Sequence, residues 1–401
     1  MIEKNENSNG MKILIVSSYL PFPLFSGGQI RLYNLIKNLS EKHSITLVCE
    51  KRESQTQRDI DEVSKICERI YTTERKKQWS AKNIIKTGFS LDPFLITGHK
   101  NLEMRKIISK LLAEEKFNLI HVETFYVMQN LPKTSLPVVL VEHNVEYKVY
   151  EKFVKKSLII VRPLLYLDVL KLKRAEKAYW KKATRLVAVS EIEAKEMSRD
   201  VEIIPNGVDI EKFKMKKNVK EKRTKVLFIG DFKWIQNRDS IVYIIKNIWP
   251  KVYAKNPDTT LWIVGKKIPD SIKNLKDDSI IFDENAPNET ERIFQEADVL
   301  LSPIRVGGGT NFKILESMSS GTPVVTTSLG NEGIKAKENE EIIICDKPEE
   351  FSNKTSLLLT DDYLYEKISR NGRKFIEKNF DWKNIAAKLD SVYSEVGKEQ
   401  R

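Results

Sequence analysis

The stretch from Ser302 to Thr327 constrains the fold of this chain more than any other part of the sequence. It reads SPIRVGGGTNFKILESMSSGTPVVTT, with three consecutive glycines, Gly307, Gly308 and Gly309. Glycines allow backbone conformations that a side chain would forbid. The elements predicted around them are a buried strand over 297–301, a helix over 312–319 capped by Thr310 or Asn311 and ending near Gly321, and a strand over 323–327.

A strand, a glycine loop and a helix N-terminus in this order form a site for anions. Free backbone N–H groups and the positive end of the helix dipole point toward such a site. Arg305 and Lys313 flank the loop, as binding of a diphosphate requires. The carboxylate of Glu316, one turn into the helix, can accept hydrogen bonds from a sugar diol such as a nucleotide ribose. An ordinary strand-to-helix turn with Glu316 facing solvent is the open alternative.

The residues from Arg305 to Val325 also resemble a known signature. Their pattern, R-x-G-G-G-T-x-x-K-x-L-E-x-M-x-x-G-x-P-V-V, is similar to the donor-nucleotide signature of glycosyltransferase family 4 (group 1), which has the GT-B fold. In that family the second glutamate of a pair holds the nucleotide ribose, and Glu316 matches it. The first glutamate would fall at Gly308. The resemblance therefore implies that backbone amides from Gly307 to Asn311 take over the recognition of the donor sugar.

Length and composition favour two soluble globular domains. The chain has 401 residues, of which 41% are hydrophobic and 31% charged. Its three cysteines are scattered and odd in number, which argues against a disulfide framework and favours a reducing, cytoplasmic location. The four histidines are not clustered, so no metal site is expected. The polar start of the chain lacks the apolar core of a signal peptide.

The net charge of +12 is unevenly distributed. Residues 1–205 carry a surplus of 10 positive charges, whereas residues 206–401 carry a surplus of 2. Residues 151–185 hold 11 Lys and Arg against 3 Asp and Glu. This basic segment, which includes Lys171, Lys173, Lys177 and Lys181, predicts either an interfacial helix on an anionic membrane or an ordinary helix with a solvated basic face. No nucleic-acid-binding module is recognisable, so no nucleic-acid partner is expected.

The chain opens with a predicted βαβ unit: a strand over 11–18, a helix over 29–42 and a strand over 44–49. Gly27 and Gly28 lie at its first switch point, where open α/β sheets bind ligands. The spacing is not G-x-G-x-x-G, which disfavours a dehydrogenase. The loop, with Arg31 after it, resembles the first loop of the same glycosyltransferases. This resemblance implies that Gly27 and Gly28 approach the donor phosphates.

Histidines follow two further predicted strands, over 118–122 and 137–141. The strand ends read HVE and EHNVE, and side chains at the carboxyl ends of parallel strands lie in the ligand crevice. The string EHNVEY resembles the family segment whose histidine contacts the transferred sugar. It implies that role for His143, with His121 as the alternative. A structural hydrogen-bonding role for both histidines stays open.

The turn at Pro205-Asn206-Gly207 resembles the hinge between the two domains of the family. We therefore expect an N-terminal acceptor-side domain over 1–205, a donor-binding domain over 206–380 and a final helical segment over 381–401 that crosses back to the first domain. Gly230 ends the first strand of the second domain. The family resemblance implies a basic residue soon after this glycine that neutralises donor phosphate, and Lys233 or Arg238 is the candidate.

Together these observations predict an α/β protein of GT-B type, with two doubly wound Rossmann-like domains facing a cleft. The resemblance implies a retaining, metal-independent hexosyltransferase without a cofactor. It would use a nucleotide-diphosphate sugar and act on a glycan or lipid-linked acceptor in polysaccharide biosynthesis. The predicted catalytic residues are His143, Arg305 and Lys313, which would stabilise charge on the departing diphosphate electrostatically.

Two other functions remain open at this point. A nucleotide-sugar epimerase on the same fold would need acid–base carboxylates, for which Glu123 and Glu142 are candidates. A non-catalytic nucleotide-sugar-binding protein would fit the absence of a glutamate at position 308.

Overall fold

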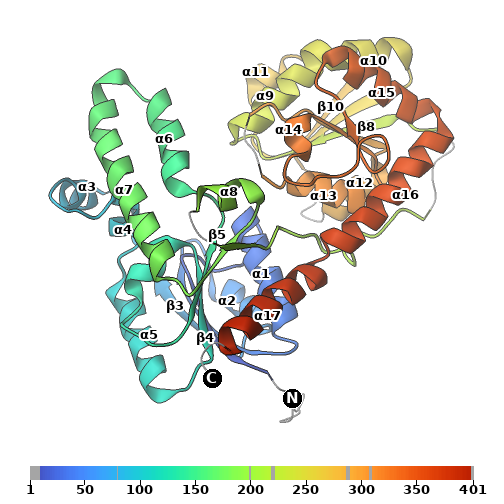
Figure 1. The fold of residues 1–401 in the computed structure, drawn as a ribbon. Helices are drawn as coiled ribbons and strands as arrows, with labels where there is room; N and C mark the ends of the chain where they lie inside the picture. The colour runs from blue at the N-terminus through green and yellow to red at the C-terminus, as the bar shows by residue number, and fades with distance from the viewer. Residues whose placement is uncertain are drawn as a thin grey trace. The chain divides into compact units, whose positions relative to one another are not determined.

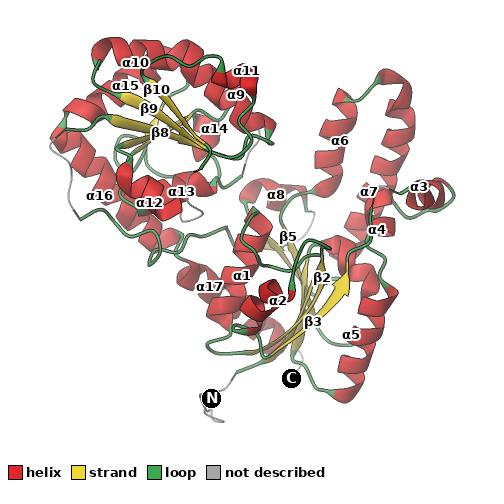
Figure 2. Cartoon of the chain, turned by 180° about the vertical axis from the view of Figure 1, so that it is seen from behind, coloured by secondary structure: helices red, strands yellow, loops and turns green. Residues whose placement is uncertain are grey.

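The computed structural model describes residues 10–78, 80–197, 200–217, 222–285, 290–306 and 309–398. The chain divides into two compact units, one formed by Met1–Pro205 with Ile385–Arg401 and the other by Asn206–Asn384. Each unit is built on a parallel β-sheet covered by helices (Figures 1 and 2). The predicted fold class, two doubly wound parallel-sheet α/β domains, is confirmed.

The first unit contains a seven-stranded sheet in the order β3-β2-β1-β4-β5-β6-β7, with every pair parallel. The chain turns to opposite sides of β1 through β2 and β4, which makes the carboxyl ends of β1 and β4 a switch point. The strands are β1 (Lys12–Ser17), β2 (Ser44–Lys51), β3 (Arg69–Glu74), β4 (Leu119–Glu123), β5 (Val138–Glu142), β6 (Arg185–Ala188) and β7 (Val201–Ile203).

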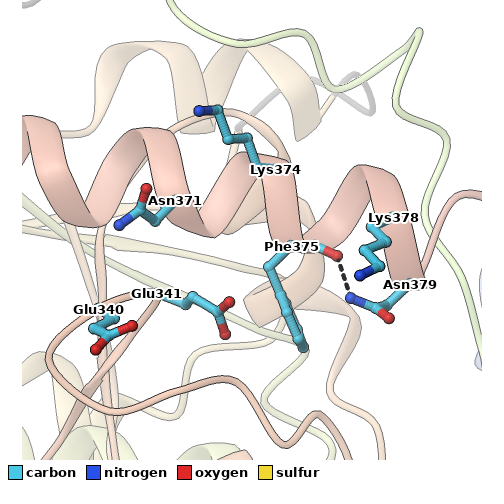
Figure 3. A pocket seen from close by; sticks show the side chains of 7 residues that line it. All are labelled: Glu340, Glu341, Asn371, Lys374, Phe375, Lys378 and Asn379. Atoms are coloured by element: carbon cyan, nitrogen blue, oxygen red, sulfur yellow. Dashed lines mark hydrogen bonds between the residues drawn. The ribbon is translucent and has the colours of Figure 1, made fainter.

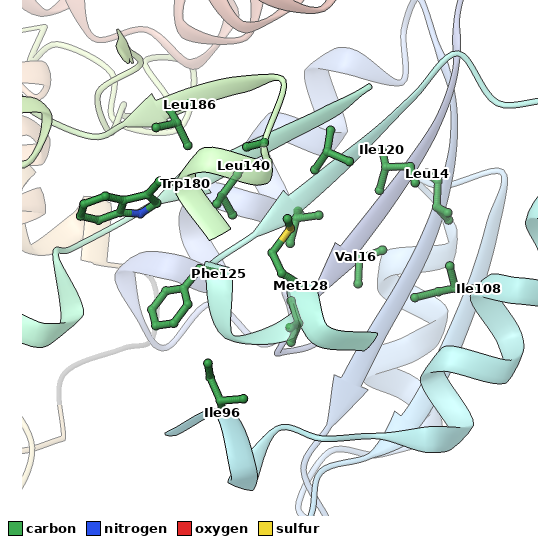
Figure 4. Close-up of a cluster of buried hydrophobic side chains, with 14 of the residues drawn as sticks. Leu14, Val16, Ile96, Ile108, Ile120, Phe125, Met128, Leu140, Trp180 and Leu186 are labelled. Atoms are coloured by element: carbon green, nitrogen blue, oxygen red, sulfur yellow. The ribbon is translucent and has the colours of Figure 1, made fainter. Parts of the chain in front are cut away.

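Helices cover both faces of this sheet, so β4 and β5 are buried along their whole length. This explains their continuous apolar sequences. Figure 4 shows part of the core, in which Leu14, Ile120 and Leu140 of the sheet are joined by Phe125 and Trp180. The helices are α1 (Gly27–Leu39), α2 (Gln57–Ser64), α3 (Ala81–Gly88), α4 (Phe94–Gly98), α5 (Leu102–Glu114), α6 (Glu146–Lys156), α7 (Arg162–Lys182) and α8 (Glu191–Glu196), with 3₁₀ turns η1 (Phe125–Asn130) and η2 (Ile159–Val161).

The second unit contains a six-stranded parallel sheet in the order β10-β9-β8-β11-β12-β13. Its strands are β8 (Lys225–Ile229), β9 (Thr260–Val264), β10 (Ile280–Asp283), β11 (Val299–Ser302), β12 (Val324–Thr326) and β13 (Ile343–Ile344). Its helices are α9 (Ile235–Tyr243), the π-helical η3 (Ile244–Ile248), α10 (Trp249–Lys255), α11 (Asp270–Lys273), α12 (Thr290–Glu296), α13 (Phe312–Ser319), α14 (Ser328–Asn331), α15 (Pro348–Thr360) and α16 (Asp362–Asn379).

The last helix, α17 (Trp382–Lys398), leaves the second unit and joins the first from Ile385 onward. Polar contacts fix it there. Asp390 accepts a hydrogen bond from Lys42 Nζ at 2.7 Å and lies 2.8 Å from His43 Nε2. Nδ1 of His43 accepts the backbone N–H of Met11, so Nε2 carries the proton that is donated to Asp390. None of the described helices is long and apolar enough to cross a membrane.

We expect Asp390→Ala to lower the free energy of unfolding by about 1–3 kcal/mol, because it leaves the buried His43 N–H without its acceptor. Denaturant unfolding of the full chain would measure this change. Glu395→Ala on the exposed face of the same helix is the matched control. Equal stability of the two variants would show that Asp390 does not anchor α17.

Candidate functional site

In the second unit, the glycine loop ends where α13 begins. Gly307 and Gly308 lie outside the described residues. Gly309 has φ +81°, a conformation that favours glycine. Gly333, which the sequence analysis did not single out, packs against this turn: a Cβ atom on Gly333 would lie 2.7 Å from the carbonyl carbon of Gly309 and 2.9 Å from the nitrogen of Thr310. The close contact therefore requires glycine at position 333, whereas the φ angle favours glycine at position 309.

The N-terminus of α13 is available to an anion. Asn311 is its N-cap, but among the described residues no side chain accepts a capping hydrogen bond, and the amide of Asn311 instead donates to the carbonyl of Gly309 at 3.3 Å. The first-turn N–H groups of a helix have no partner within the helix itself. The turn from Thr310 to Asn311 thus presents backbone donors together with the positive end of the helix dipole.

Lys313 lies in the first turn of α13 and is held by Asn237. Its Nζ donates to Asn237 Oδ1 at 2.8 Å and lies 4.7 Å from the centre of the Phe228 ring. Burial lowers the pKa of Lys313 to about 8, partly opposed by Glu316. Asn237 is neutral, so the cation has no ion-pair partner in this contact.

Gly230 is needed because Asn237 rests on its backbone. A Cβ atom at Gly230 would lie 2.7 Å from the Asn237 amide group, which also donates to the carbonyl of Asp231 at 2.9 Å. The structure therefore brings the predicted residues Gly230 and Lys313 together through Asn237. No motif in the sequence indicates this role for Asn237.

Glu316 follows Lys313 by one turn and is half-buried. Burial raises its pKa to about 7, although Lys212 and Lys313 act in the opposite direction. Its carboxylate makes no hydrogen bond or ion pair with any residue in the described part of the chain. A half-buried carboxylate without a protein partner is suited to accept hydrogen bonds from a ligand.

Arg305 and Lys233, the other predicted phosphate ligands, are both paired with carboxylates. Arg305 makes two hydrogen bonds to Asp239, at 3.1 and 2.8 Å, and stacks on the Tyr243 ring at 4.1 Å. Lys233 Nζ lies 3.0 Å from Asp231 Oδ2. Each cation would have to leave its carboxylate to bind phosphate, so their roles stay predictions, and Lys313 is the better-placed cation.

In the first unit, α1 starts at Gly27, with Ser26 as its N-cap. A Cβ atom on Gly28 would lie 3.0 Å from Tyr19 Oη and 3.3 Å from Cε1 of His143. The N-terminus of α1 and the end of β5 are therefore in contact. The structure thus brings the predicted residues Gly28 and His143 side by side.

Glu123, at the end of β4, is the centre of this site and is fully buried. Its Oε1 lies 2.5 Å from His143 Nε2, and its Oε2 lies 2.6 Å from His121 Nε2. Arg31 Nε is 4.0 Å from Oε1, and the Tyr19 hydroxyl donates to the same oxygen at 3.5 Å. Burial alone would raise the pKa of Glu123, but the charge of His143 and the hydrogen bonds from both histidines hold it well below its usual range.

His143 and His121 differ in what their second ring nitrogen does. Nδ1 of His121 lies 2.5 Å from the hydroxyl of Tyr393 on α17, so this buried histidine is engaged on both sides. His143 is half-buried, and within the described residues its Nδ1 makes no hydrogen bond. A ligand can therefore reach His143 but not His121, which favours His143 as the ligand-contacting histidine.

Glu142 belongs to a separate buried cluster. It accepts a hydrogen bond from Trp180 Nε1 at 3.1 Å, and burial together with the nearby Glu176 raises its pKa well above its usual range. Glu176 in turn accepts the backbone N–H groups of Glu146 and Tyr147, at 2.8 and 3.0 Å. These contacts cap the start of α6, which is a structural role.

Two other features contribute nothing to this site. In the part of the chain that the structure describes, no group of three or more His, Cys, Asp or Glu side chains is placed to hold a metal ion. A pocket of about 540 Å³ lies beside α16, and none of the predicted site residues lines it (Figure 3). It is lined by Glu340, Glu341, Asn371, Lys374, Phe375, Lys378 and Asn379.

Two family models match the chain. Glycosyltransferase Family 4 matches residues 25–212, and Glycosyl transferases group 1 matches residues 223–361. Among similar proteins, an "uncharacterized 44.6 kDa protein in cps region" of Klebsiella pneumoniae is 24% identical, over 96% of this chain and 99% of its own length. An Escherichia coli UDP-Gal:alpha-D-GlcNAc-diphosphoundecaprenol alpha-1,3-galactosyltransferase is 25% identical, over 72% of this chain and 78% of its own.

Solved structures of similar fold extend over almost the whole chain. Sucrose-phosphate synthase from Thermosynechococcus elongatus aligns with a TM-score of 0.67 and 16% identity, covering 96% of this chain and 99% of its own. HepE from Anabaena, in complex with UDP and glucose, aligns with a TM-score of 0.63 and 12% identity, covering 96% of this chain and 99% of its own. These structural matches show the GT-B fold. The two family models together match residues 25–212 and 223–361, so the chain belongs to the family 4, group 1, glycosyltransferases.

Proposed function

We propose that this glycosyltransferase transfers a hexose from a nucleotide-diphosphate sugar, with retention of anomeric configuration and without a metal ion. One observation carries the proposal. The half-buried Glu316 of α13 has no hydrogen-bond or ion-pair partner among the described residues, and the cation Lys313 lies one turn before it, in the first turn of the helix. An acceptor for ribose hydroxyls, a cation for phosphate and backbone donors are thereby combined over a few residues.

The chemistry follows from where charge develops. When the bond between the anomeric carbon and the phosphate oxygen breaks, negative charge grows on the departing diphosphate and positive charge on the sugar ring. Lys313 and the amides around Gly309 to Asn311 stabilise the diphosphate, in a preorganised electrostatic role. Arg305, Lys233 and the helix start at Gly27 and Gly28 are proposed to assist. Cationic side chains then supply the stabilisation that a metal ion would otherwise give.

His143 is proposed to contact the transferred sugar through Nδ1. Its Nε2 is bound to Glu123, which fixes the ring orientation. Gly28 beside it leaves room that a larger residue would fill. Glu123 therefore acts as a positioning residue for His143.

A lipid-linked acceptor in polysaccharide biosynthesis is proposed for two reasons. The Escherichia coli relative is named for transfer to a diphosphoundecaprenol-linked sugar. The first domain of this chain also carries a surplus of 10 positive charges, which favours an anionic surface or acceptor. The protein would then work in the cytoplasm, peripherally at the inner face of the membrane.

The two rival functions are not favoured. An epimerase needs carboxylates that can exchange protons with the sugar, but Glu123 is held by two histidines and Glu142 lies in a separate structural cluster. A non-catalytic binding protein has no need for a histidine fixed beside the N-terminus of α1.

The proposal is tested by incubating the full chain with UDP-, GDP- and ADP-sugars and measuring the shift in thermal stability. Binding of the correct donor raises apparent stability by mass action. The donor that binds is then supplied with a membrane lipid extract, and transfer of labelled sugar to the lipid fraction is measured. Binding of no nucleotide sugar would refute the function, and isomerised donor without transfer would establish the epimerase.

We expect affinity for an intact nucleotide sugar to be highest between about pH 7 and 8. The lower bound is the pKa of Glu316, about 7, and the upper bound is the pKa of Lys313, about 8. Hydrogen bonds from ribose need ionised Glu316, so binding weakens as the pH falls below 7. Phosphate needs protonated Lys313, so binding also weakens above 8. Glu316→Gln should lower affinity about tenfold or more at pH 7.5 and flatten the acidic limb. Calorimetry checks this, with Glu332→Gln as the control, and an unchanged acidic limb contradicts the ribose assignment.

Asn237→Asp should weaken binding of the nucleotide sugar about tenfold, because a carboxylate beside Lys313 competes with phosphate for the cation. Affinity for the nucleoside, which lacks phosphates, should stay unchanged. Asn247→Asp on η3 provides an exposed control. Equal losses for nucleoside and nucleotide sugar would indicate a folding defect instead of a phosphate role.

His143→Ala should reduce sugar transfer by about a hundredfold while affinity for the nucleotide diphosphate stays within about twofold, because the contact is to the sugar. Glu123→Gln should produce a smaller loss of the same kind. Stability is measured in parallel, since Glu123 is buried. If transfer survives in His143→Ala and is lost in a folded His121→Gln variant, the sugar contact belongs to His121.

A further inference from the structure

Helices α6 and α7 form an antiparallel hairpin, with η2 at its turn. Both views show this hairpin rising from the sheet of the first unit, with α3 beside α7 (Figures 1 and 2). The sheet-proximal half of α7 contributes Leu172 and Trp180 to the core. The other end of the hairpin has no residue in that core, although its sequence is strongly apolar.

The apolar side chains at this end are open to solvent. We define the hairpin tip as Leu158–Val161 together with Leu164. Leu158, Ile159 and Ile160 are 76%, 78% and 86% exposed, and Leu164 is 69% exposed. Isolated exposed apolar residues are common, but a run of them on one projecting element marks an interaction surface. Further exposed apolar residues lie on the same hairpin and on or just after α3: Val149, Phe153, Tyr166, Leu167, Leu170, Ile84, Ile85, Phe89 and Leu91.

Basic residues surround the tip. Over residues 151–167 there are four basic side chains, Lys152, Lys155, Lys156 and Arg162, and one acidic side chain, Glu151. The three lysines occupy the end of α6 and are exposed. Aliphatic side chains at a tip, with lysines behind them, match the acyl and headgroup layers of an anionic bilayer.

The structure shows that some of the basic residues predicted to face a membrane contact other parts of the chain instead. Lys171, which the sequence analysis grouped with the lipid-facing candidates, donates to the carbonyls of Thr87 and Ser90 at 2.8 and 2.7 Å. Lys173 lies 5.2 Å from the Tyr147 ring centre. Lys171 holds the end of α3 against α7, so its replacement would disturb the fold. Of the lysines at the end of α6, Lys155 lies 3.7 Å from Glu151 of the same helix, a contact that holds no other element in place.

We propose that the hairpin tip inserts into the interfacial layer of an anionic lipid membrane. A second copy of the chain is the rival occupant. In a two-fold dimer, however, each tip would bring its own basic residues against those of its partner, with only Glu151 to offset them. Membrane phosphates complement the same charges. This inference narrows the proposed membrane contact to a defined surface and does not depend on the donor or acceptor.

The test is co-sedimentation of the full chain with vesicles of phosphatidylcholine alone and of phosphatidylcholine mixed with phosphatidylglycerol, at low and high salt. The parent should bind the mixed vesicles, and high salt should weaken this binding because the lysine contribution is screened. Replacing Ile159 and Ile160 by serine should lower the partition coefficient at least about tenfold, because two aliphatic side chains no longer leave water. Leu102→Ser, at a 62% exposed site on α5, is the matched control.

Replacing Lys152 and Lys156 by glutamine should lower binding to the mixed vesicles only, with Lys106→Gln and Lys133→Gln together as the control. Binding of nucleotide sugar should be the same in all variants, which separates a failure of this inference from a failure of the proposed function. No binding of the parent to mixed vesicles at low salt overturns the inference, as does equal binding by the tip variant. A parent dimer that the tip variant dissociates, without vesicle binding, would assign the tip to a second copy.

Discussion

The first unit is organised around an ionised carboxylate with no exposure to solvent. Burying an unpaired charge costs several kcal/mol, so Glu123 can lie at the end of β4 only if its neighbours compensate it. They come from four other parts of the chain: Tyr19 after β1, Arg31 on α1, His143 after β5 and, through His121, Tyr393 on α17. The orientation of His143 and one contact of α17, that of Tyr393 with His121, are therefore tied to one buried charge.

The second unit uses a carboxylate in the opposite way. Glu316 is half-buried and has no protein partner within the described residues, so burial raises its pKa to about 7, whereas the paired Glu123 has its pKa lowered. Glu123 is paired with residues of the fold, whereas Glu316 is the acid for which we propose a ligand. The same contrast separates the cations, since Arg305 is paired with Asp239 but Lys313 rests on the neutral Asn237.

Local sequence patterns predicted those structural features that depend only on residues close together in the chain. The helix expected over 312–319 coincides with α13, and Gly321 after it has φ +69°, as a helix-ending glycine should. Contacts between residues far apart in the sequence could not be predicted. Asn237 meets Lys313 across 76 residues, and Tyr393 meets His121 across 272. Gly333 was missed because its close contact with Gly309 leaves no trace in local sequence. The family signature predicts a candidate site, and the folded chain adds the residues that contact its members, such as Asn237 and Glu123.

In the basic segment, the number of charged residues likewise does not predict which of them contact other parts of the chain. The sequence gives 11 Lys and Arg over residues 151–185 but not their partners. Lys171 is committed to the carbonyls of Thr87 and Ser90, while the exposed apolar residues lie at the far end of the hairpin, from Leu158 to Leu164. A helix pair needs apolar residues where it packs, not where it ends in solvent. In the proposed membrane-bound state the apolar side chains of the hairpin tip would leave water, and the energetic cost of exposing them would be removed.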